Sequence, residues 1–296
     1  MNSLAKQKYL FIYISLIVPI SLLILFVIYP MGELFRISFT NWNGLSLEQT
    51  FVGFQNYSTM IFQSPDLWLS LRNNMVYFFT HLSFIPIELA LAVMLNSTFF
   101  GSKFFKSITF MPYILNGVAV AYAFSYFLSP INGGLNATLT LFGLDSLIHN
   151  WLSETAIVNH ILASVSLWKF SGYHIILFIA ALQSIPKEML EAATVDGANA
   201  FQKFRYIQIP SIKMVVDFVL FTNVVGSLQT FDIPFVMTSG GPGYASYTFT
   251  LYTINTAFKY NNFGLAATMA IAMIFLVVII YGVQSFVIKY VGRDKR

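Results

Sequence analysis

Six long apolar stretches, separated by shorter polar segments, divide this chain of 296 residues. A helix needs about 20 mostly apolar residues to cross the hydrocarbon core of a bilayer. In lipid, only a helix or a closed barrel satisfies all of its own backbone hydrogen bonds. The sequence therefore predicts an all-α integral membrane protein with six transmembrane helices. Their expected bounds are 9–29, 73–95, 107–128, 160–182, 212–231 and 263–288.

The composition supports a membrane setting for the whole chain. Hydrophobic residues make up 57% of it and charged residues only 9%, whereas soluble domains carry about 25% charged residues. We expect a single transmembrane domain that covers residues 1–296. A cleaved signal peptide is the competing interpretation of the first stretch. Its apolar run is too long for that, and Tyr29-Pro30-Met31 follows it in place of a small-residue cleavage site.

The Lys and Arg residues predict how the helices are oriented, because cytoplasmic loops retain positive charge. With the N-terminus inside, twelve of the 16 basic residues fall on the cytoplasmic side. Arg36, Arg72 and Lys259 fall outside, and Lys169 lies within the fourth span. The sequence therefore predicts cytoplasmic N- and C-termini and a cytoplasmic loop over residues 183–211.

This loop is a polar segment with strong local helix signals. Pro186 suits the first position of a helix, and Glu188 adds negative charge to the first turn. Gly197 offers a helix stop, and a second helical run over 198–206 is expected to end before Pro210. From composition alone, the segment could be an ordinary helical loop between two spans.

The spacing within the loop is more specific than its composition. Glu191-Ala192-Ala193 is followed after three residues by Gly197 and, after nine more, by Ile207-Gln208-Ile209-Pro210. This pattern resembles the EAA motif in the permeases of binding-protein-dependent ABC importers, with Ile209 in place of the usual leucine. The resemblance implies a coupling helix that docks on a separate cytosolic ATPase. The residues implied in that contact are Glu191, Ala192, Ala193, Asp196, Gly197 and Pro210.

A second pattern surrounds the start of the sixth predicted span. Thr238-Ser239-Gly240-Gly241-Pro242 precedes Ser246, and Phe263-Gly264-Leu265-Ala266-Ala267 follows. With Gly53-Phe54-Gln55-Asn56-Tyr57 in the first outer segment, it resembles the carbohydrate-uptake permeases of the MalF and UgpA type. From the residues alone, the glycines could also form an ordinary turn outside the membrane. The resemblance covers nearly the whole chain and implies the type I ABC importer permease fold.

The resemblance also implies that this chain is a permease subunit that moves a sugar or oligosaccharide across the bacterial cytoplasmic membrane by alternating access. Expected partners are a second homologous permease, a cytosolic ATPase dimer that holds ATP and Mg²⁺, an extracellular solute-binding protein and membrane lipid. A glycerol-phosphate or another anionic carbohydrate-like solute is the alternative substrate. We expect no cofactor on this chain.

Polar residues within the spans indicate where a solute could bind, because each is costly in lipid and tends to face a cavity. Lys169 lies in the fourth span, where a cation costs ~2.5–3.5 kcal/mol, and Trp168, Phe170 and Tyr173 surround it. Aromatic side chains of this kind suit sugars, because their faces pack on C–H groups while their polar tips bond hydroxyls. We therefore expect a sugar site near Lys169.

Two interpretations of Lys169 remain open from the sequence. It could form a structural ion pair with Glu88, Asp217 or an acid of the partner subunit. It could instead contact an anionic or amino-substituted ligand. The sequence does not decide between them.

The fifth span carries a polar stripe of Asn223, Ser227 and Thr230 along one helix face. Packing between helices through small residues is the structural alternative for this stripe. Alignment with the MalF-type permeases, starting from the EAA segment, implies substrate contacts at or near positions in both spans. These are Lys169, Phe170, Tyr173, Asn223, Gly226, Ser227 and Thr230.

Other function classes lack the residues that they require. The sequence has no G-x4-G-K-S/T loop for a phosphate and no cysteine for a disulfide or thiolate site. The scattered basic residues argue against nucleic-acid binding, and we expect neither catalytic residues nor a metal site. An ion-coupled carrier is the remote alternative, but only Glu88 and Asp217 offer carboxylates within the spans. The histidines, none at metal-ligand spacing, are His81, His149, His160 and His174.

Overall fold

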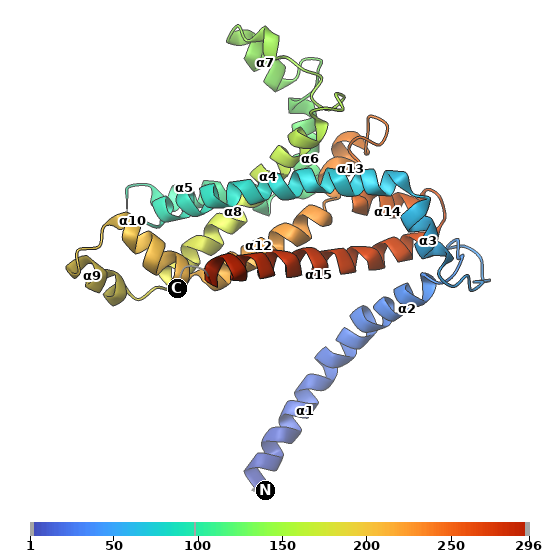
Figure 1. The fold of residues 1–296 in the computed structure, drawn as a ribbon, viewed down its shortest axis with the longest axis horizontal. Coiled ribbons are helices and arrows are strands. Elements are labelled where there is room, and N and C mark those ends of the chain that lie inside the picture. The colour runs from blue at the N-terminus through green and yellow to red at the C-terminus, as the bar shows by residue number, and fades with distance from the viewer. Residues whose placement is uncertain (1–2, 98, 294–296) are drawn as a thin grey trace. The chain divides into compact units, whose positions relative to one another are not determined.

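The structure is a computed structural model that describes residues 3–97 and 99–293. Most of the described backbone is helical (Figure 1), which confirms the all-α prediction. Within these ranges the one strand-like pairing is an antiparallel bridge between Thr40 and Phe51. The α-helices are α1 Ser3–Leu23, α2 Tyr29–Ile37, α3 Gln55–Phe62, α4 Pro65–Asn96, α5 Ser102–Ile114, α6 Gly117–Phe127, α7 Gly134–Leu141, α8 Val158–Gln183, α9 Lys187–Val195, α10 Ala200–Lys203, α11 Ile209–Ser211, α12 Lys213–Leu228, α13 Asp232–Thr238, α14 Phe249–Phe258 and α15 Phe263–Arg293.

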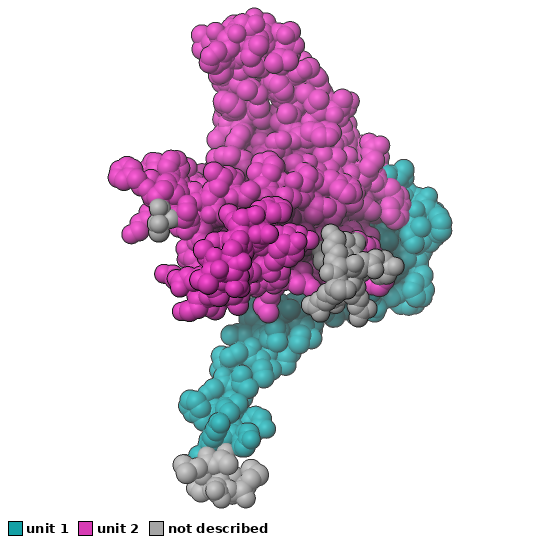
Figure 2. Space-filling view, turned by 60° about the vertical axis from the view of Figure 1, so that its left-hand side comes forward, with its two compact units in different colours: residues 1–65, 253–275 teal, residues 66–252, 276–296 magenta. Residues whose placement is uncertain are grey.

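The chain forms two compact units (Figure 2). The first comprises residues 1–65 and 253–275, and the second comprises residues 66–252 and 276–296. The second unit contains the polar residues expected to bind a solute and the whole of the predicted cytoplasmic loop.

Five helical segments are long and apolar enough to cross a membrane. They are Gln7–Ile37, Pro65–Asn96, Val158–Gln183, Lys213–Thr238 and Phe263–Val287. A sixth span would have to be formed by α5 and α6 together, and these two helices are bent by 96° relative to each other. The expected third span, 107–128, is therefore not one straight helix.

The bend between α5 and α6 has a local cause in the sequence. Pro112 lacks an N–H group, and Leu115 takes an extended conformation that ends α5. Asn116 then caps the next helix, because its Oδ1 accepts hydrogen bonds from the backbone N–H groups of Val118 at 2.9 Å and Ala119 at 3.2 Å. Hydropathy averaged over a window of residues cannot detect such a cap, because it takes no account of hydrogen bonds at a helix end.

Two helical runs continue past a proline and beyond the ends that the sequence predicted for them. The first span continues past Pro30 to Ile37, and the helical run of the cytoplasmic loop continues past Pro210 to Ser211. In both places a π-helical turn, Ile24–Ile28 or Phe204–Gln208, directly precedes the short helix that holds the proline. The regular bond pattern is already interrupted there, so the missing N–H of the proline has little cost.

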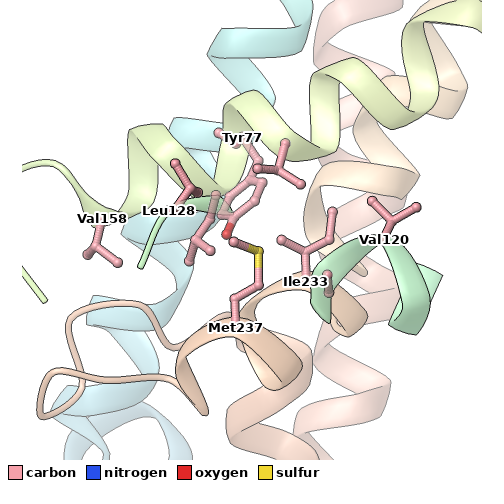
Figure 3. Packing of buried hydrophobic residues seen from close by; sticks show 10 residues of the cluster. Tyr77, Val120, Leu128, Val158, Ile233 and Met237 are labelled. Carbon is pink, nitrogen blue, oxygen red and sulfur yellow. The ribbon is translucent and has the colours of Figure 1, made fainter. Parts of the chain in front are cut away.

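The core of the second unit consists of two clusters of buried apolar side chains. The first cluster joins α4, α6, α8 and α13, and Figure 3 shows Tyr77, Ile233 and Met237 turned toward one another in it. The second cluster joins α4, α8 and α12 and includes Ile185 and Ile212 at the two ends of the predicted loop. Both clusters hold α4 and α8 together, so these helices form the centre of the unit.

Buried amides on α4 fix the segment that follows α13. Asn73 donates from Nδ2 to the backbone carbonyls of Ala245 and Tyr247, each at 2.9 Å. Asn74 donates from Nδ2 to the carbonyl of Ser227 at 2.5 Å and accepts from the N–H of Phe249 at 2.7 Å. The glycine-containing turn after α13 is therefore held by side chains from a helix some 170 positions away in sequence.

The first unit brings together two of the sequence patterns identified above. Asn56 donates from Nδ2 to the carbonyls of Ser38 and Thr40, each at 2.8 Å. A Cβ at Gly264 would lie 1.9 Å from that same Thr40 carbonyl oxygen, so only glycine fits the approach. Both patterns therefore contact the backbone carbonyl of Thr40, which explains why one contains Asn56 and the other Gly264.

We expect replacement of Gly172 by alanine to destabilise the second unit. Gly172 lies where α5 packs on α8, and a Cβ there would meet the carbonyl oxygen of Thr109 at 1.9 Å. Such overpacking costs about 1–3 kcal/mol, so the thermal unfolding midpoint in detergent should fall. Gly282→Ala is the matched control, because nothing lies within 4 Å of a Cβ at that position. Equal midpoints for both variants would contradict the close approach.

Candidate functional site

All seven residues expected to contact a solute line one cavity of about 370 Å³ in the second unit. Helices α8 and α12, which carry most of them, pack against each other although they are separated by the whole cytoplasmic loop. The residues are Lys169, Phe170, Tyr173, Asn223, Gly226, Ser227 and Thr230.

Aromatic side chains form one wall of the cavity. The rings of Tyr113 on α5 and Tyr173 on α8 are stacked, with their centroids 4.7 Å apart and an interplanar angle of 16°. The ring of Phe170 meets Tyr113 edge-on at 6.2 Å. Such a wall presents apolar faces beside polar groups, which is the surface that a sugar ring requires.

Lys169 has a different partner from those considered in the sequence. Its Nζ donates a hydrogen bond at 2.8 Å to the carbonyl of Leu115, the residue that ends α5. Glu88 is 3.0 Å from Nδ1 of His174 instead, and no described residue forms an ion pair with Lys169 within 4.0 Å. An intrachain ion pair with Glu88 or Asp217 is therefore ruled out in this arrangement. The negative end of the α5 helix dipole and the nearby carboxylate of Asp232 compensate the charge instead.

The residues of the polar stripe differ in how deeply they are buried. Asn223 and Ser227 are buried, and Ser227 donates from Oγ to the carbonyl of Asn223 at 2.6 Å. Thr230 is partly buried and donates from Oγ1 to the carbonyl of Gly226 at 2.8 Å. A Cβ built at Gly226 would meet nothing within 4 Å. The stripe thus serves packing at Asn223 and Ser227, while Gly226 faces open space and the partly buried Thr230 lines the cavity.

A buried polar chain lies at one side of the cavity. His174 bridges two helices, because Nδ1 is 3.0 Å from Oε2 of Glu88 on α4 and Nε2 is 3.4 Å from Oγ1 of Thr222 on α12. His174 and Thr222 also line the cavity. His81, another lining residue, is 3.1 Å from the hydroxyl of Ser166. These contacts fix α4, α8 and α12 around the cavity.

The predicted coupling segment, residues 183–211, contains a helix with a well-formed C-terminal cap. α9 ends at Val195, and Gly197 follows with a φ of +81°. The N–H of Ala198 bonds to the carbonyl of Ala193 at 2.9 Å, and the N–H of Gly197 to that of Thr194 at 3.1 Å. This is the Schellman arrangement, whose left-handed position favours glycine. The glycine of the sequence pattern is thus required by the turn.

The next helix of the segment begins with a reciprocal cap that the sequence analysis did not identify. The Oδ1 of Asn199 accepts from the N–H of Gln202 at 2.9 Å, and the Oε1 of Gln202 accepts from the N–H of Asn199 at 2.8 Å. This capping box starts α10 directly after the glycine turn. Pro186 is the N-cap of α9, one position before its predicted place.

Most of the residues expected to contact an ATPase are open to solvent in this chain. Among them only Ala193 is buried. Two apolar side chains on α9 are also exposed, Met189 and Val195, the latter at 88%. The exposed set is Glu191, Ala192, Asp196, Gly197 and Pro210.

Comparison with known proteins decides the family. Residues 84–293 match the model of the binding-protein-dependent transport system inner membrane component. The chain belongs to this family. It is a multi-pass membrane protein and a component of a transport system.

Relatives and solved structures of this permease family agree with the match. The multiple sugar-binding transport system permease protein MsmF of Streptococcus mutans is 31% identical over 271 residues, which cover 91% of this chain and 92% of the relative. A bacterial ABC transporter involved in the import of the acidic polysaccharide alginate has a chain with a TM-score of 0.82 and 24% identity, and both chains are covered to 100%. The same kind of transporter, in complex with an alginate pentasaccharide-bound periplasmic protein, matches with a TM-score of 0.79 and 24% identity over 93% of this chain and 92% of the other. The expected ABC importer permease fold is confirmed.

Several residues that line the permease cavity were not predicted. Tyr113 comes from α5, and no local pattern marks it, because its place depends on how α5 packs on α8. Asp232 directly follows the predicted end of the fifth span and so was assigned to the outer segment. The other lining residues outside the predicted set are His81, Ser166, His174, Phe221, Thr222, Val225, Gln229, Phe231 and Ile233. Within the described ranges, no group of three or more His, Asp or Glu side chains could hold a metal ion.

Proposed function

We propose that this permease is a membrane subunit of an ATP-driven importer and that a sugar or oligosaccharide passes through the cavity between α8 and α12. The position of the coupling segment is the observation that supports this proposal most. The segment joins the C-terminal end of α8 to the N-terminal end of α12, the two helices that carry the predicted solute contacts. A force on the segment therefore acts on both walls of the cavity.

The ends of the coupling segment are suited to transmit such a force. Ile185 and Ile212 flank it, and each is buried in the apolar cluster with Leu182 and Val219. Between these anchors, α9 and α10 form a hairpin fixed by the Gly197 cap and by a bond from Nζ of Lys203 to Oγ1 of Thr194 at 3.1 Å. A hairpin fixed at both ends moves with the spans rather than independently of them.

The partners follow from this arrangement. We propose that the exposed side of α9 docks on one subunit of a cytosolic ATPase dimer, which holds the ATP and Mg²⁺. Since the chain has one coupling segment, a second homologous permease would engage the other ATPase subunit, and the six spans would act as one transmembrane domain. The apolar window of Gln7–Ile37 has no buried residue in this chain, so lipid and that second subunit could cover it.

The relatives support the direction and the class of cargo. MsmF is named for multiple sugar-binding transport, and the solved alginate transporter was captured with a periplasmic protein that holds a saccharide. We propose that a binding protein outside the bacterial cytoplasmic membrane likewise delivers a saccharide to this permease, with the termini and the coupling segment in the cytoplasm.

The test is uptake in vesicles that hold the full transporter with its binding protein. We expect saccharide uptake to require ATP and to continue when an uncoupler removes the ion gradients. Uptake without ATP that an uncoupler abolishes would instead assign the chain to an ion-coupled carrier.

A further inference from the structure

We infer that Asp232 carries the ligand-facing charge of the cavity and makes it select uncharged saccharides over acidic ones. This inference rests on the proposed function and specifies its substrate class. It concerns a residue that lies between the polar stripe of α12 and the start of α13.

Lys169, the cation of the cavity, is poorly available to a ligand. Its exposed fraction is only 7%, and its Nζ is bonded to the carbonyl of Leu115 at 2.8 Å. That carbonyl ends α5, where the negative end of a helix dipole stabilises a cation. Lys169 therefore stabilises the break between α5 and α6, and its charge is also attracted by the carboxylate of Asp232.

The carboxylate of Asp232, in contrast to the amine of Lys169, is available to a ligand. Its side chain is exposed and lines the cavity, and no described residue donates a hydrogen bond to its carboxylate. A Cβ at Gly117 would lie 2.7 Å from its Oδ2, so the carboxylate sits at the first residue of α6, where the positive end of the dipole favours it. An ionised carboxylate only accepts hydrogen bonds. It can take the hydroxyl donors of a saccharide, and it repels a second carboxylate.

The other ionisable groups at the cavity do not offer a free cation. His174 is bonded to the buried Glu88 at 3.0 Å, and His81 faces the hydroxyl of Ser166 at 3.1 Å. Lys169, whose charge already interacts with Asp232, is therefore the one lysine or arginine among the described residues that line the cavity. An acidic ligand would have to compete with Asp232 for the charge of Lys169. A neutral ligand would find an acceptor in Asp232 and leave that interaction intact.

The test uses vesicles that hold the complete transporter with its own binding protein. They are offered an equimolar mixture of neutral oligosaccharides and uronate oligosaccharides of the same lengths, and mass spectrometry identifies what is taken up. With wild type we expect ATP-dependent uptake of neutral probes at least tenfold above acidic ones. Asp232→Asn should lower neutral uptake about tenfold and narrow the ratio, and Asp232→Glu should restore the preference, because it keeps the charge.

Asp217→Asn is the matched control, because Asp217 lies on α12 but does not line the cavity. It should leave both uptake rates unchanged, and ATP hydrolysis by each assembled variant shows that it folds. Since every variant receives cargo from the same binding protein, a changed ratio belongs to the permease.

Three results would overturn the inference, and the third is distinguishable from the first two. ATP-dependent uptake in which the acidic probes equal or exceed the neutral ones, or an Asp232→Asn variant identical to wild type, would refute the selection while the proposed importer function stands. Absence of any ATP-dependent uptake would refute the proposed function and the inference with it.

Discussion

Replacing Gly226 by phenylalanine is expected to stop saccharide uptake while the permease still folds and assembles. Gly226 is one of the predicted contact positions, and nothing lies within 4 Å of a Cβ built on it. A benzyl group there would extend into the cavity of about 370 Å³ rather than into packed atoms. Uptake should fall by roughly tenfold or more, equivalent to about 1.4 kcal/mol of lost binding. Labelled-saccharide uptake into vesicles measures it.

Gly226→Ala is the control for this prediction. A methyl group leaves most of the open space, so uptake should stay close to that of wild type. Gly226 is in the interior of α12, where alanine is also the better helix former. If the phenylalanine variant transports at the wild-type rate, the cavity between α8 and α12 is not the solute pathway.

Replacing Gly197 by valine is expected to uncouple ATP hydrolysis from transport. The backbone at Gly197 has a φ of +81°, which a β-branched residue adopts only with strain. The left-handed conformation costs about 1–2 kcal/mol for such a residue, and relief of this strain would break the bonds of Gly197 and Ala198 that end α9. With the direction of α9 lost, uptake and the stimulation of ATP hydrolysis by the loaded binding protein should both fall about tenfold.

Gly197→Asn separates the effect of the backbone from that of the side chain. Asparagine tolerates the left-handed region and is found at this helix-capping position, so it should retain most of the coupling. No Cβ clash complicates the comparison, because nothing lies within 4 Å of that position. If valine and asparagine behave alike, or both resemble wild type, the turn does not control the docking surface.

The sequence predicted much of this fold because the relevant signals are local. Apolar length locates a span wherever lipid surrounds it, and the helices Val158–Gln183 and Phe263–Arg293 begin and end close to the expected bounds. The spacing of Glu191 and Gly197 likewise located a short helix and its stop. Pro210 was a weaker guide, because the π turn before it lets the chain continue as a helix.

The predicted cavity residues came together because two spans that flank one loop pack on each other. That much follows from chain order, since consecutive spans cross the membrane in opposite directions and consecutive elements are usually neighbours in space. The partner of Lys169 does not follow from it. The carbonyl of Leu115 is available only because Asn116 caps a new helix and bends the chain by 96°.

By itself, the sequence determined the membrane setting, the helical class and the exposed loop between α8 and α12, because hydropathy, spacing and capping act over a few turns. The tertiary structure alone decided that Tyr113 and Asp232 complete the cavity and that Lys169 bonds to a helix end. These features depend on which helices approach each other and at what depth. The approach of the helices is set by contacts between residues far apart in the chain, such as the close contact of Gly172 with the backbone of Thr109.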